Sequence, residues 1–326
     1  LHFGIGKAAK ATAIEIVWGN GRQQSLTDIE ANQTITLKQA DANETPAIAK
    51  VKTKFSNITA QAGLNFKHSE NEYDDFAKEI LLPQKQSANG PFMGVGDVNG
   101  DGLEDCMIGG AKGQAAALYL QQKNGKFSKA KSNAWEADKG CEDMGIAFFD
   151  ADGDKDLDIY VVSGGGGDVE AGSANLQDRL YLNGGKGNFT KSNDALPKML
   201  MSGQAVAPQD FDGDGDMDLF VGGRAVSGNY PGAERSFLLQ NEGGRFTDIT
   251  ESAAMELKDL GMVNDALWSD FDGAGRKDLI VVGEWMPLQF FQNTGGKLTN
   301  VSDAMGLKDT EGWWFSIAEG DFNEDG

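Results

Sequence analysis

The sequence predicts an all-β protein: a partial β-propeller of four-stranded blades, preceded by the remnant of a small N-terminal β domain. Two observations carry this prediction. A nine-residue acidic motif recurs along the chain, and each copy is followed by short apolar runs bounded by Gly, Asn and Asp. The copies begin at intervals of 53, 60, 60 and 51 residues, at Asp97, Asp150, Asp210, Asp270 and Asp321. A repeat of this length is typical of propeller blades or solenoid units.

Each repeat has the same order of predicted strands. In the second repeat, "MGIAFF" (144–149) leads into the acidic motif, and "DIYVVSGG", "RLYLNG" and "GNFTKS" follow it. Four short strands with no convincing helix favour a propeller blade. The predicted blades span about 91–130, 144–193, 204–250 and 263–302, and 313–326 begins the next one. A complete ring is expected to have seven blades.

Residues 1–40 do not follow the repeat. "ATAIEIVWGNGRQQSLTDI" (11–29) reads as two strands joined at a Gly-Asn-Gly turn, and "QTITLK" (33–38) reads as a third. Residues 41–54 are a predicted linker, and the propeller is predicted to occupy 55–326. The fragment 55–59 resembles a fourth strand without its first three, so we expect it to complete the last blade of a closed ring and cover its edges. We expect both chain ends to be cut, because the chain starts without Met and stops inside an acidic motif.

The acidic motif suits a hard cation that takes oxygen ligands. Calcium binds 6–8 oxygens from carboxylates, carbonyls and water, and Gly within the loop lets the chain curl around the ion. Side chains at motif positions 1, 3, 5 and 9 and the carbonyl at position 7 are the candidate ligands. An EF-hand would need Glu at position 12, where this chain has Ile108, Val161, Val221 and Val281. Magnesium is the less suitable ion because it gives up its waters reluctantly.

The candidate calcium ligands form three nearly complete loops and one incomplete loop. We expect about three strong sites and a fourth that is weak or empty, because Ala274 replaces a carboxylate there. The alternative is a set of acidic turns without metal. The predicted ligands are Asp97, Asn99, Asp101, Leu103 and Asp105; Asp150, Asp152, Asp154, Asp156 and Asp158; Asp210, Asp212, Asp214, Asp216 and Asp218; Asp270, Asp272 and Asp278; and Asp321, Asn323 and Asp325.

At these loops the chain resembles the FG-GAP/VCBS repeats of integrin α-subunit propellers and of many exported bacterial proteins. The Phe-Gly…Gly-Ala-Pro sequence itself is missing, so the calcium loop carries the resemblance. The opening "LHFGIG…IEIVWGNGRQQSLTDIEANQTITL" resembles the end of an ASPIC/UnbV domain, as in cartilage acidic protein and bacterial relatives. The resemblance implies calcium binding, export to the cell surface, periplasm or exterior, and a role in binding or adhesion.

A ligand is expected on the face opposite the calcium loops. Repeat length varies mostly between the second and third strands, and insertions on one face of a repeat protein often mark its binding face. The long loops are about 163–178 and 224–235. Large aromatic and charged residues of this face suit a glycan or protein ligand: Arg224, Tyr230, Glu284, Trp285, Trp313 and Trp314. The alternative is that they pack between blades, with Arg224 paired to Glu234 or Asp265.

Composition and missing motifs exclude or weaken other functions. A net charge of −21 argues against nucleic acid, and no apolar run approaches the ~20 residues of a membrane span. No nucleophile elbow, P-loop or zinc-protease motif occurs. The sequence leaves enzyme activity open and favours a non-enzyme; the alternatives to a binding module are a polysaccharide hydrolase or lyase and a structural scaffold. The acidic clusters 69–76 and Glu142-Asp143 are interpreted as solvated.

Cys106 and Cys141 are predicted to be unpaired. Cys106 begins a second strand beside an acidic loop, whereas Cys141 precedes a first strand at the other end of a blade. A five-residue strand separates such ends by ~15 Å, which is too far for a disulfide.

Overall fold

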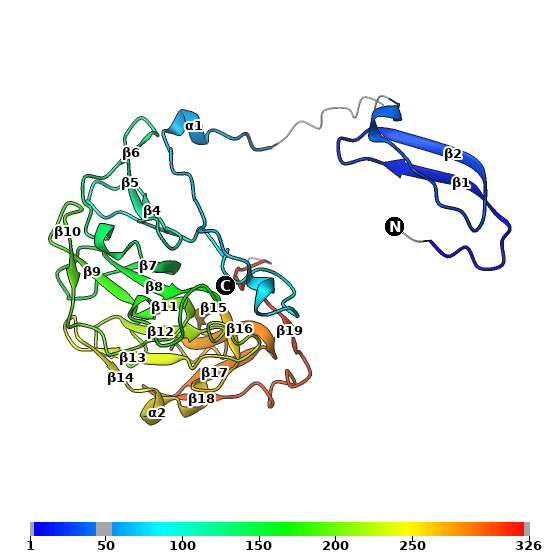
Figure 1. Cartoon of the computed structure of the whole chain (residues 1–326). Coiled ribbons are helices and arrows are strands. Elements are labelled where there is room, and N and C mark those ends of the chain that lie inside the picture. Colours follow the sequence, from blue (N-terminus) through cyan, green and yellow to red (C-terminus); the bar gives the residue numbers. More distant parts are fainter. Residues whose placement is uncertain (1–2, 44–53, 323–326) are drawn as a thin grey trace. The chain divides into compact units, whose positions relative to one another are not determined.

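The computed structural model describes residues 3–43 and 54–322 (Figure 1). The chain divides into two compact units, Leu1–Asn57 and Ile58–Gly326. Most of the predicted linker, residues 44–53, lies outside the described residues. Within the described part, no helix is long and apolar enough to cross a bilayer.

The N-terminal unit is an antiparallel hairpin of β1 (Lys10–Val17) and β2 (Gln23–Glu30). Its turn closes through hydrogen bonds between the backbones of Trp18 and Arg22 at 2.9 Å and of Gly21 and Trp18 at 2.7 Å. The expected third strand at 33–38 is not formed. These residues carry no strand pairing, and they lead into the short helix η1 (Gln39–Asp41).

The second unit contains four sheets of the predicted blade type, each an antiparallel meander in chain order. The prediction of an all-β partial propeller is confirmed. The strands of the first blade are β3 (Met93–Gly96), β4 (Asp105–Ile108), β5 (Ala117–Gln121) and β6 (Phe127–Lys129). Those of the second are β7 (Glu142–Phe149), β8 (Asp158–Gly164), β9 (Arg179–Asn183) and β10 (Phe189–Ser192).

The third and fourth blades repeat this plan. The third has β11 (Gly203–Gln209), β12 (Asp218–Gly223), β13 (Phe237–Asn241) and β14 (Phe246–Asp248). The fourth has β15 (Met262–Ser269), β16 (Asp278–Met286), β17 (Gln289–Asn293) and β18 (Leu298–Asn300). The short β19 (Gly312–Trp313) pairs with the end of β16.

Short helices lie between the blades and beside them. They are α1 (Thr59–Ala62), η2 (Asp75–Ala77), η3 (Glu136–Asp138), η4 (Ala174–Leu176), α2 (Thr250–Ala253) and η5 (Met255–Leu257). Residues 55–58 carry no strand, and Thr59 begins α1, so the fragment 55–59 is not a strand in this structure. Its role in closing a ring stays a prediction.

Apolar side chains pack between neighbouring blades. Successive strand residues point to opposite faces of a sheet, so β12 serves two interfaces. Leu219 and Val221 belong to the core shared with the second blade, whereas Phe220 belongs to the core shared with the fourth. A third core joins the first and second blades and includes Met107 and Ile159.

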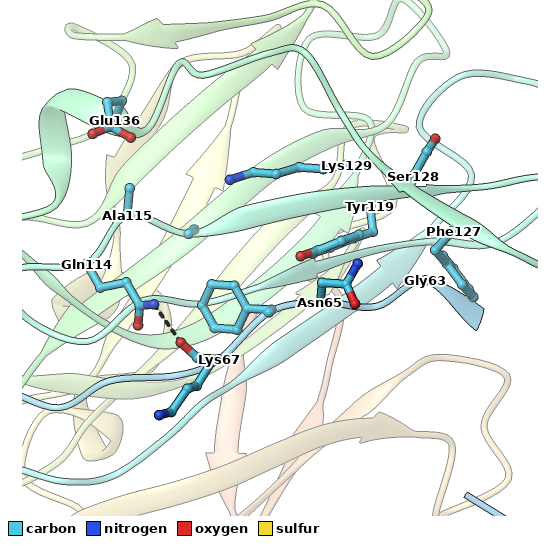
Figure 2. A pocket seen from close by; sticks show the side chains of 12 residues that line it. Gly63, Asn65, Lys67, Gln114, Ala115, Tyr119, Phe127, Ser128, Lys129 and Glu136 are labelled. Atoms are coloured by element: carbon cyan, nitrogen blue, oxygen red, sulfur yellow. Dashed lines mark hydrogen bonds between the residues drawn. The ribbon is translucent and has the colours of Figure 1, made fainter. Parts of the chain in front are cut away.

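The outer face of the first blade is open. A Cβ on Gly94 would lie 2.6 Å from Ile146 Cγ2, so glycine lets β3 approach the second blade closely. Met93 and Val95 point to the other side and are 60% and 53% exposed. A cavity of about 690 Å³ lies on this blade between β5, β6 and the segment 63–67 (Figure 2). Gln114 closes one side through a 2.8 Å hydrogen bond to the Lys67 carbonyl.

Both cysteines are buried and free, as predicted. Cys106 lies in β4 and is covered by Leu64 and Phe66, whereas Cys141 directly precedes β7. Burial raises the pKa of both thiols, which keeps them protonated.

Buried asparagines link the second, third and fourth blades each to the blade before it. Asn241, at the end of β13, donates from Nδ2 to the carbonyls of Ala151 at 2.8 Å and Met217 at 3.1 Å. The first carbonyl belongs to the acidic loop of the second blade, and the second belongs to that of the third. Asn183 and Asn293 make the same pair of bonds in their own blades. One amide group therefore holds two successive acidic loops.

We expect Asn241→Ala to lower the free energy of unfolding by about 1–3 kcal/mol, because the buried Ala151 carbonyl and the half-buried Met217 carbonyl lose this donor. Thermal or denaturant unfolding followed by circular dichroism measures the change. The matched control is Glu242→Ala at the next, exposed position, which should stay within about 0.5 kcal/mol of the parent. Equal stabilities for the two variants would contradict this role of the asparagine.

Candidate metal centres and the opposite face

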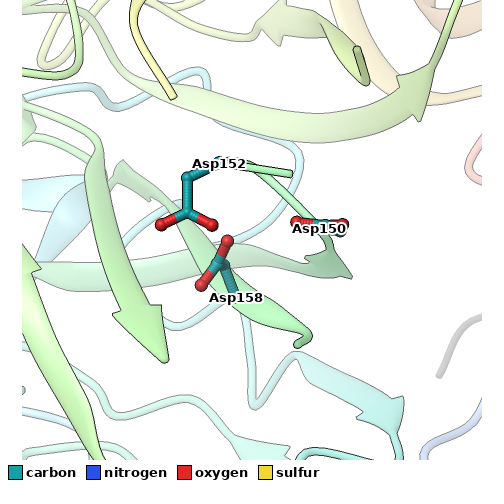
Figure 3. Close-up of side chains that lie close together, drawn as sticks. All are labelled: Asp150, Asp152 and Asp158. Atoms are coloured by element: carbon teal, nitrogen blue, oxygen red, sulfur yellow. The ribbon is translucent and has the colours of Figure 1, made fainter. Parts of the chain in front are cut away.

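Three aspartate triads lie in the acidic loops of the second, third and fourth blades. Their members occupy motif positions 1, 3 and 9, and in each triad one ligand atom from every residue lies within 4.8 Å of the others. Figure 3 shows the second-blade triad, in which Asp152 and Asp158 approach each other beside Asp150. The triads are Asp150, Asp152 and Asp158; Asp210, Asp212 and Asp218; and Asp270, Asp272 and Asp278.

The ninth-position aspartate is buried at the start of the second strand. Asp158 pairs in register with Phe149, so it closes the hairpin that carries the loop. One of its oxygens accepts from the Ala151 N–H at 2.8 Å, and the other accepts from the Asn183 N–H at 2.7 Å. Asp218 repeats this arrangement with Phe211 and Asn241.

The first-position aspartate organises the turn. Asp150 accepts from the N–H groups of Gly153 at 2.8 Å and Lys155 at 2.9 Å. Both donors have positive φ, +81° and +75°, which explains why glycine is common at these motif positions. Lys155 adopts the same conformation without being glycine.

Carboxylates are crowded in these loops. Burial is the main cause that raises the pKa of Asp158 to about 6 and that of Asp218 to about 7, and neighbouring carboxylates raise both further. The backbone hydrogen bonds act in the opposite direction without cancelling these effects. The loops therefore have a strong excess of negative charge, which a bound cation would neutralise.

The fourth loop has the same triad as its neighbours despite Ala274. Asp270 Oδ1 and Asp278 Oδ2 are buried and have no hydrogen-bond partner among the described residues. Position 5 contributes to none of the triads, so its loss in this loop leaves the triad intact. The geometry gives no reason to rank this loop below the second and third.

The first loop differs from the other three. Within the described chain its carboxylates form no such triad, because Asn99 stands at position 3. The Asn99 amide instead donates to Asp105 Oδ2 at 3.2 Å. Although burial acts in the opposite direction, backbone N–H groups lower the pKa of Asp97.

The other predicted ligands stabilise the turns or lie elsewhere. Asp154 and Asp214 each accept from the N–H two residues later, at 2.9 Å, and Asp101 accepts from the Leu103 N–H at 3.0 Å. Asp216 accepts from the Gly243 N–H at 2.9 Å, and Asp156 lies beside Gly185. Asp321 lies in the described chain, whereas Asn323 and Asp325 lie outside it.

On the opposite face, Arg224 forms a buried ion pair with Glu284. The distance from Nη2 to Oε1 is 2.6 Å, and both side chains are at most 6% exposed. The guanidinium also donates to Gln86 Oε1 at 2.6 Å and Asn264 Oδ1 at 3.1 Å. The alternative that Arg224 pairs with a carboxylate is confirmed, but the partner is neither Glu234 nor Asp265, because the end of β16 brings Glu284 to it instead.

Four aromatic residues that were predicted to contact a ligand lie close to the Arg224–Glu284 pair or to one another. Tyr230 OH donates to Glu284 Oε2 at 3.1 Å and accepts from Trp285 Nε1 at 2.8 Å. Trp285 is 58% exposed and meets Trp313 edge to face at 5.2 Å between ring centroids. Its φ of +58° is unusual for a bulky residue and marks local strain. Trp314 is 40% exposed, and its indole donates to the Thr310 carbonyl at 3.0 Å.

The segment 67–90 crosses this face, and the sequence did not predict this placement. We call residues 67–90 the strap; it is cyan in Figure 1. Its Tyr73 hydroxyl donates to the Gly167 carbonyl at 2.8 Å, and Glu79 accepts from the Tyr230 N–H at 2.8 Å. The interpretation of 69–76 as a solvated turn is wrong for Asp75, which is fully buried and accepts from the Gln86 and Ser87 backbone.

Glu142 and Asp143 are also buried, contrary to their interpretation as solvated. Asp143 pairs with Arg179 at 2.7 Å, and Glu142 accepts from the Lys112 N–H at 2.7 Å. A second cavity, of about 520 Å³, is lined partly by Arg179 and Lys191. Glu142 and Glu70 line neither this cavity nor the one on the first blade.

Comparison with known proteins adds family information. No curated protein matches the chain. A family model described as ASPIC and UnbV matches residues 1–44. The model of the FG-GAP-like repeat matches 97–161, 165–221 and 270–326, which together make up more than half of the chain and include all four acidic loops. With its repeated acidic hairpins and four-stranded blades, the chain belongs to the FG-GAP-like repeat family and carries an ASPIC/UnbV segment before its propeller.

Proposed function

We propose that the chain is a calcium-binding β-propeller module of an exported protein, located outside the cell, at its surface or in the periplasm. On this proposal it binds a glycan or protein ligand on the face opposite the acidic loops. The observation that carries the calcium part is the recurrence of the aspartate triad at the same place in three blades. Location rests on the family resemblance alone.

The donor set of each triad fits calcium. Every candidate ligand is an oxygen, and the orphaned oxygens of Asp270 and Asp278 are buried acceptors that a cation would satisfy. Calcium accepts such mixed carboxylate, carbonyl and water ligands in flexible geometry. The ion would neutralise the crowded carboxylates and hold the hairpin between the first and second strands, so its role is structural.

Calcium is expected to raise the unfolding temperature, and Asp218→Asn is expected to remove one site. A ligand that binds only the folded state at 100 times its Kd stabilises it by about 2.7 kcal/mol. Thermal unfolding in calcium and in EDTA, with isothermal titration calorimetry for stoichiometry, measures both effects. The matched control is Asp216→Asn, in the same loop but outside the triad. Unchanged stoichiometry in Asp218→Asn would contradict the assignment.

Calcium affinity is expected to fall as the pH falls from 8 to 6. In the calcium-free protein the pKa values of Asp158 and Asp218 are raised to about 6 and about 7, so protons compete with calcium there. The folded state then binds more protons than the unfolded chain, whose aspartates titrate near pH ~3.9. Calcium-free stability should therefore fall as the pH rises from about 4, near the unfolded pKa, to about 7, the higher of the folded pKa values.

Calorimetry in two buffers of different ionisation enthalpy measures the protons released on binding. Release near pH 6.5 that disappears above pH 9 would agree with these pKa values. Binding without proton release at pH 6.5 would contradict them.

The aromatic residues near β16 are the best candidates for ligand contact. The Trp285 indole N–H already donates a hydrogen bond to the Tyr230 hydroxyl. Its exposed ring is therefore available to stack on a sugar or an aromatic side chain. Strained backbone conformations such as that of Trp285 are common at ligand sites. Arg224 and Glu284 are too buried for direct contact and instead position Tyr230.

Trp285→Ala is expected to weaken retention on a binding polysaccharide or protein by about 30-fold, the equivalent of a ~2 kcal/mol hot spot. A panel of polysaccharides is tested in calcium and in EDTA, with retention and released product both recorded. Met255→Ala, an exposed apolar change elsewhere, is the control. Released sugar fragments would overturn the binding reading in favour of a hydrolase or lyase.

A further inference from the structure

A second acidic cluster lies where the strap meets the loop between β8 and β9, on the face opposite the acidic loops. Glu70 and Asn71 belong to the strap, and Asp168 belongs to the β8–β9 loop. Asn71 Nδ2 donates to Asp168 Oδ2 at 3.2 Å, so the two segments are in direct contact. All three residues are outside the repeated acidic motif.

Three oxygen atoms of this cluster are orphaned. Among the described residues, Glu70 Oε2, Asn71 Oδ1 and Asp168 Oδ1 are buried and have no hydrogen-bond partner. The Asp168 side chain is only 2% exposed. A buried carboxylate oxygen without a donor is costly, and each such group needs an explanation such as a bound ion or water. Asn71 contacts Asp168, and Glu70 precedes Asn71 in the strap. The other oxygen of Glu70, Oε1, lies 2.8 Å from His68 Nε2. Three acceptor oxygens without donors in this region favour a cation between the strap and the β8–β9 loop.

The charges around this cluster also favour a bound cation. Lys112 lies 3.8 Å from Asp168 Oδ2 and also donates to the Asp168 carbonyl. The nearby Arg179 is already paired with Asp143. Burial is the main cause that raises the pKa of Glu142 to about 8, and the negative charges of Glu70 and Asp168 add to it. Lys112 beside Asp168 and the His68 ring beside Glu70 therefore face three carboxylates, those of Glu70, Glu142 and Asp168.

We propose that Glu70, Asn71 and Asp168 bind a calcium ion that fastens the strap to the second blade. The donors are two carboxylates and one amide oxygen, which is the ligand chemistry of a hard cation. With fewer carboxylates than the loops and with Lys112 beside it, this site is weaker than theirs. A Kd of about 10⁻⁴–10⁻³ M, typical of extracellular calcium modules, is expected.

The test counts calcium ions bound to the full chain after chelator treatment, by equilibrium dialysis and calorimetry. Asp168→Asn and Glu70→Gln should each reduce the number bound by one. Glu72→Gln, an exposed strap carboxylate two residues from Glu70, should leave it unchanged. Trypsin cleavage at the exposed strap lysines gives a local readout, which calcium should slow in the parent chain but not in Asp168→Asn.

Full stoichiometry in both Asp168→Asn and Glu70→Gln would overturn the site and assign the orphaned oxygens to water. If Asp168→Asn fails to fold by circular dichroism, Glu70→Gln decides. The loop variant Asp218→Asn separates this inference from the loop sites. It should lose one ion yet keep calcium protection of the strap, and loss of that protection would assign the effect to the loops.

Discussion

The buried aspartate at the ninth position of each acidic loop is the group on which the blades depend. Asp158 begins one strand, accepts a hydrogen bond from the loop before it and accepts another from the end of the third strand. One carboxylate thus fixes three parts of a blade. Burying it is unfavourable, as its raised pKa shows. Two N–H donors compensate only part of that cost, so the folded hairpin creates a place for a cation.

The same strand end carries the contact to the preceding blade. Asn183 uses its backbone N–H for Asp158 of its own blade and its side-chain amide for the Val98 carbonyl of the first blade. Asn183 therefore connects the acidic loop of the second blade with that of the first. This nearest-neighbour coupling is expected where stability is a sum of repeat and interface terms. It also gives a reason for the asparagine that ends three of the four third strands, a signal that was visible in the sequence.

The blades could be predicted because their determinants are local. An acidic turn between two apolar runs fixes both the hairpin and its register, and Asp158 begins β8 as the motif indicates. The strap could not be predicted, because its contacts join distant positions: Gln86 and Arg224 are 138 residues apart. The fourth site was expected to be weak or empty because Ala274 stands at position 5. The structure brings together the carboxylates of positions 1, 3 and 9 in that loop as in the second and third, which spacing alone does not reveal. The strength of that site stays a prediction.

Arg224 and Glu284 illustrate why residue type alone does not reveal whether a side chain is buried. A buried ion pair is strongly destabilised when one partner is withdrawn, because the other charge remains uncompensated. A ligand that recruited Arg224 would have to supply that compensation inside a region closed by Gln86 and Asn264. The outer oxygen of Glu284 instead holds Tyr230, and Tyr230 holds the Trp285 indole. The buried ion pair is therefore placed to orient the exposed Trp285 ring through Tyr230.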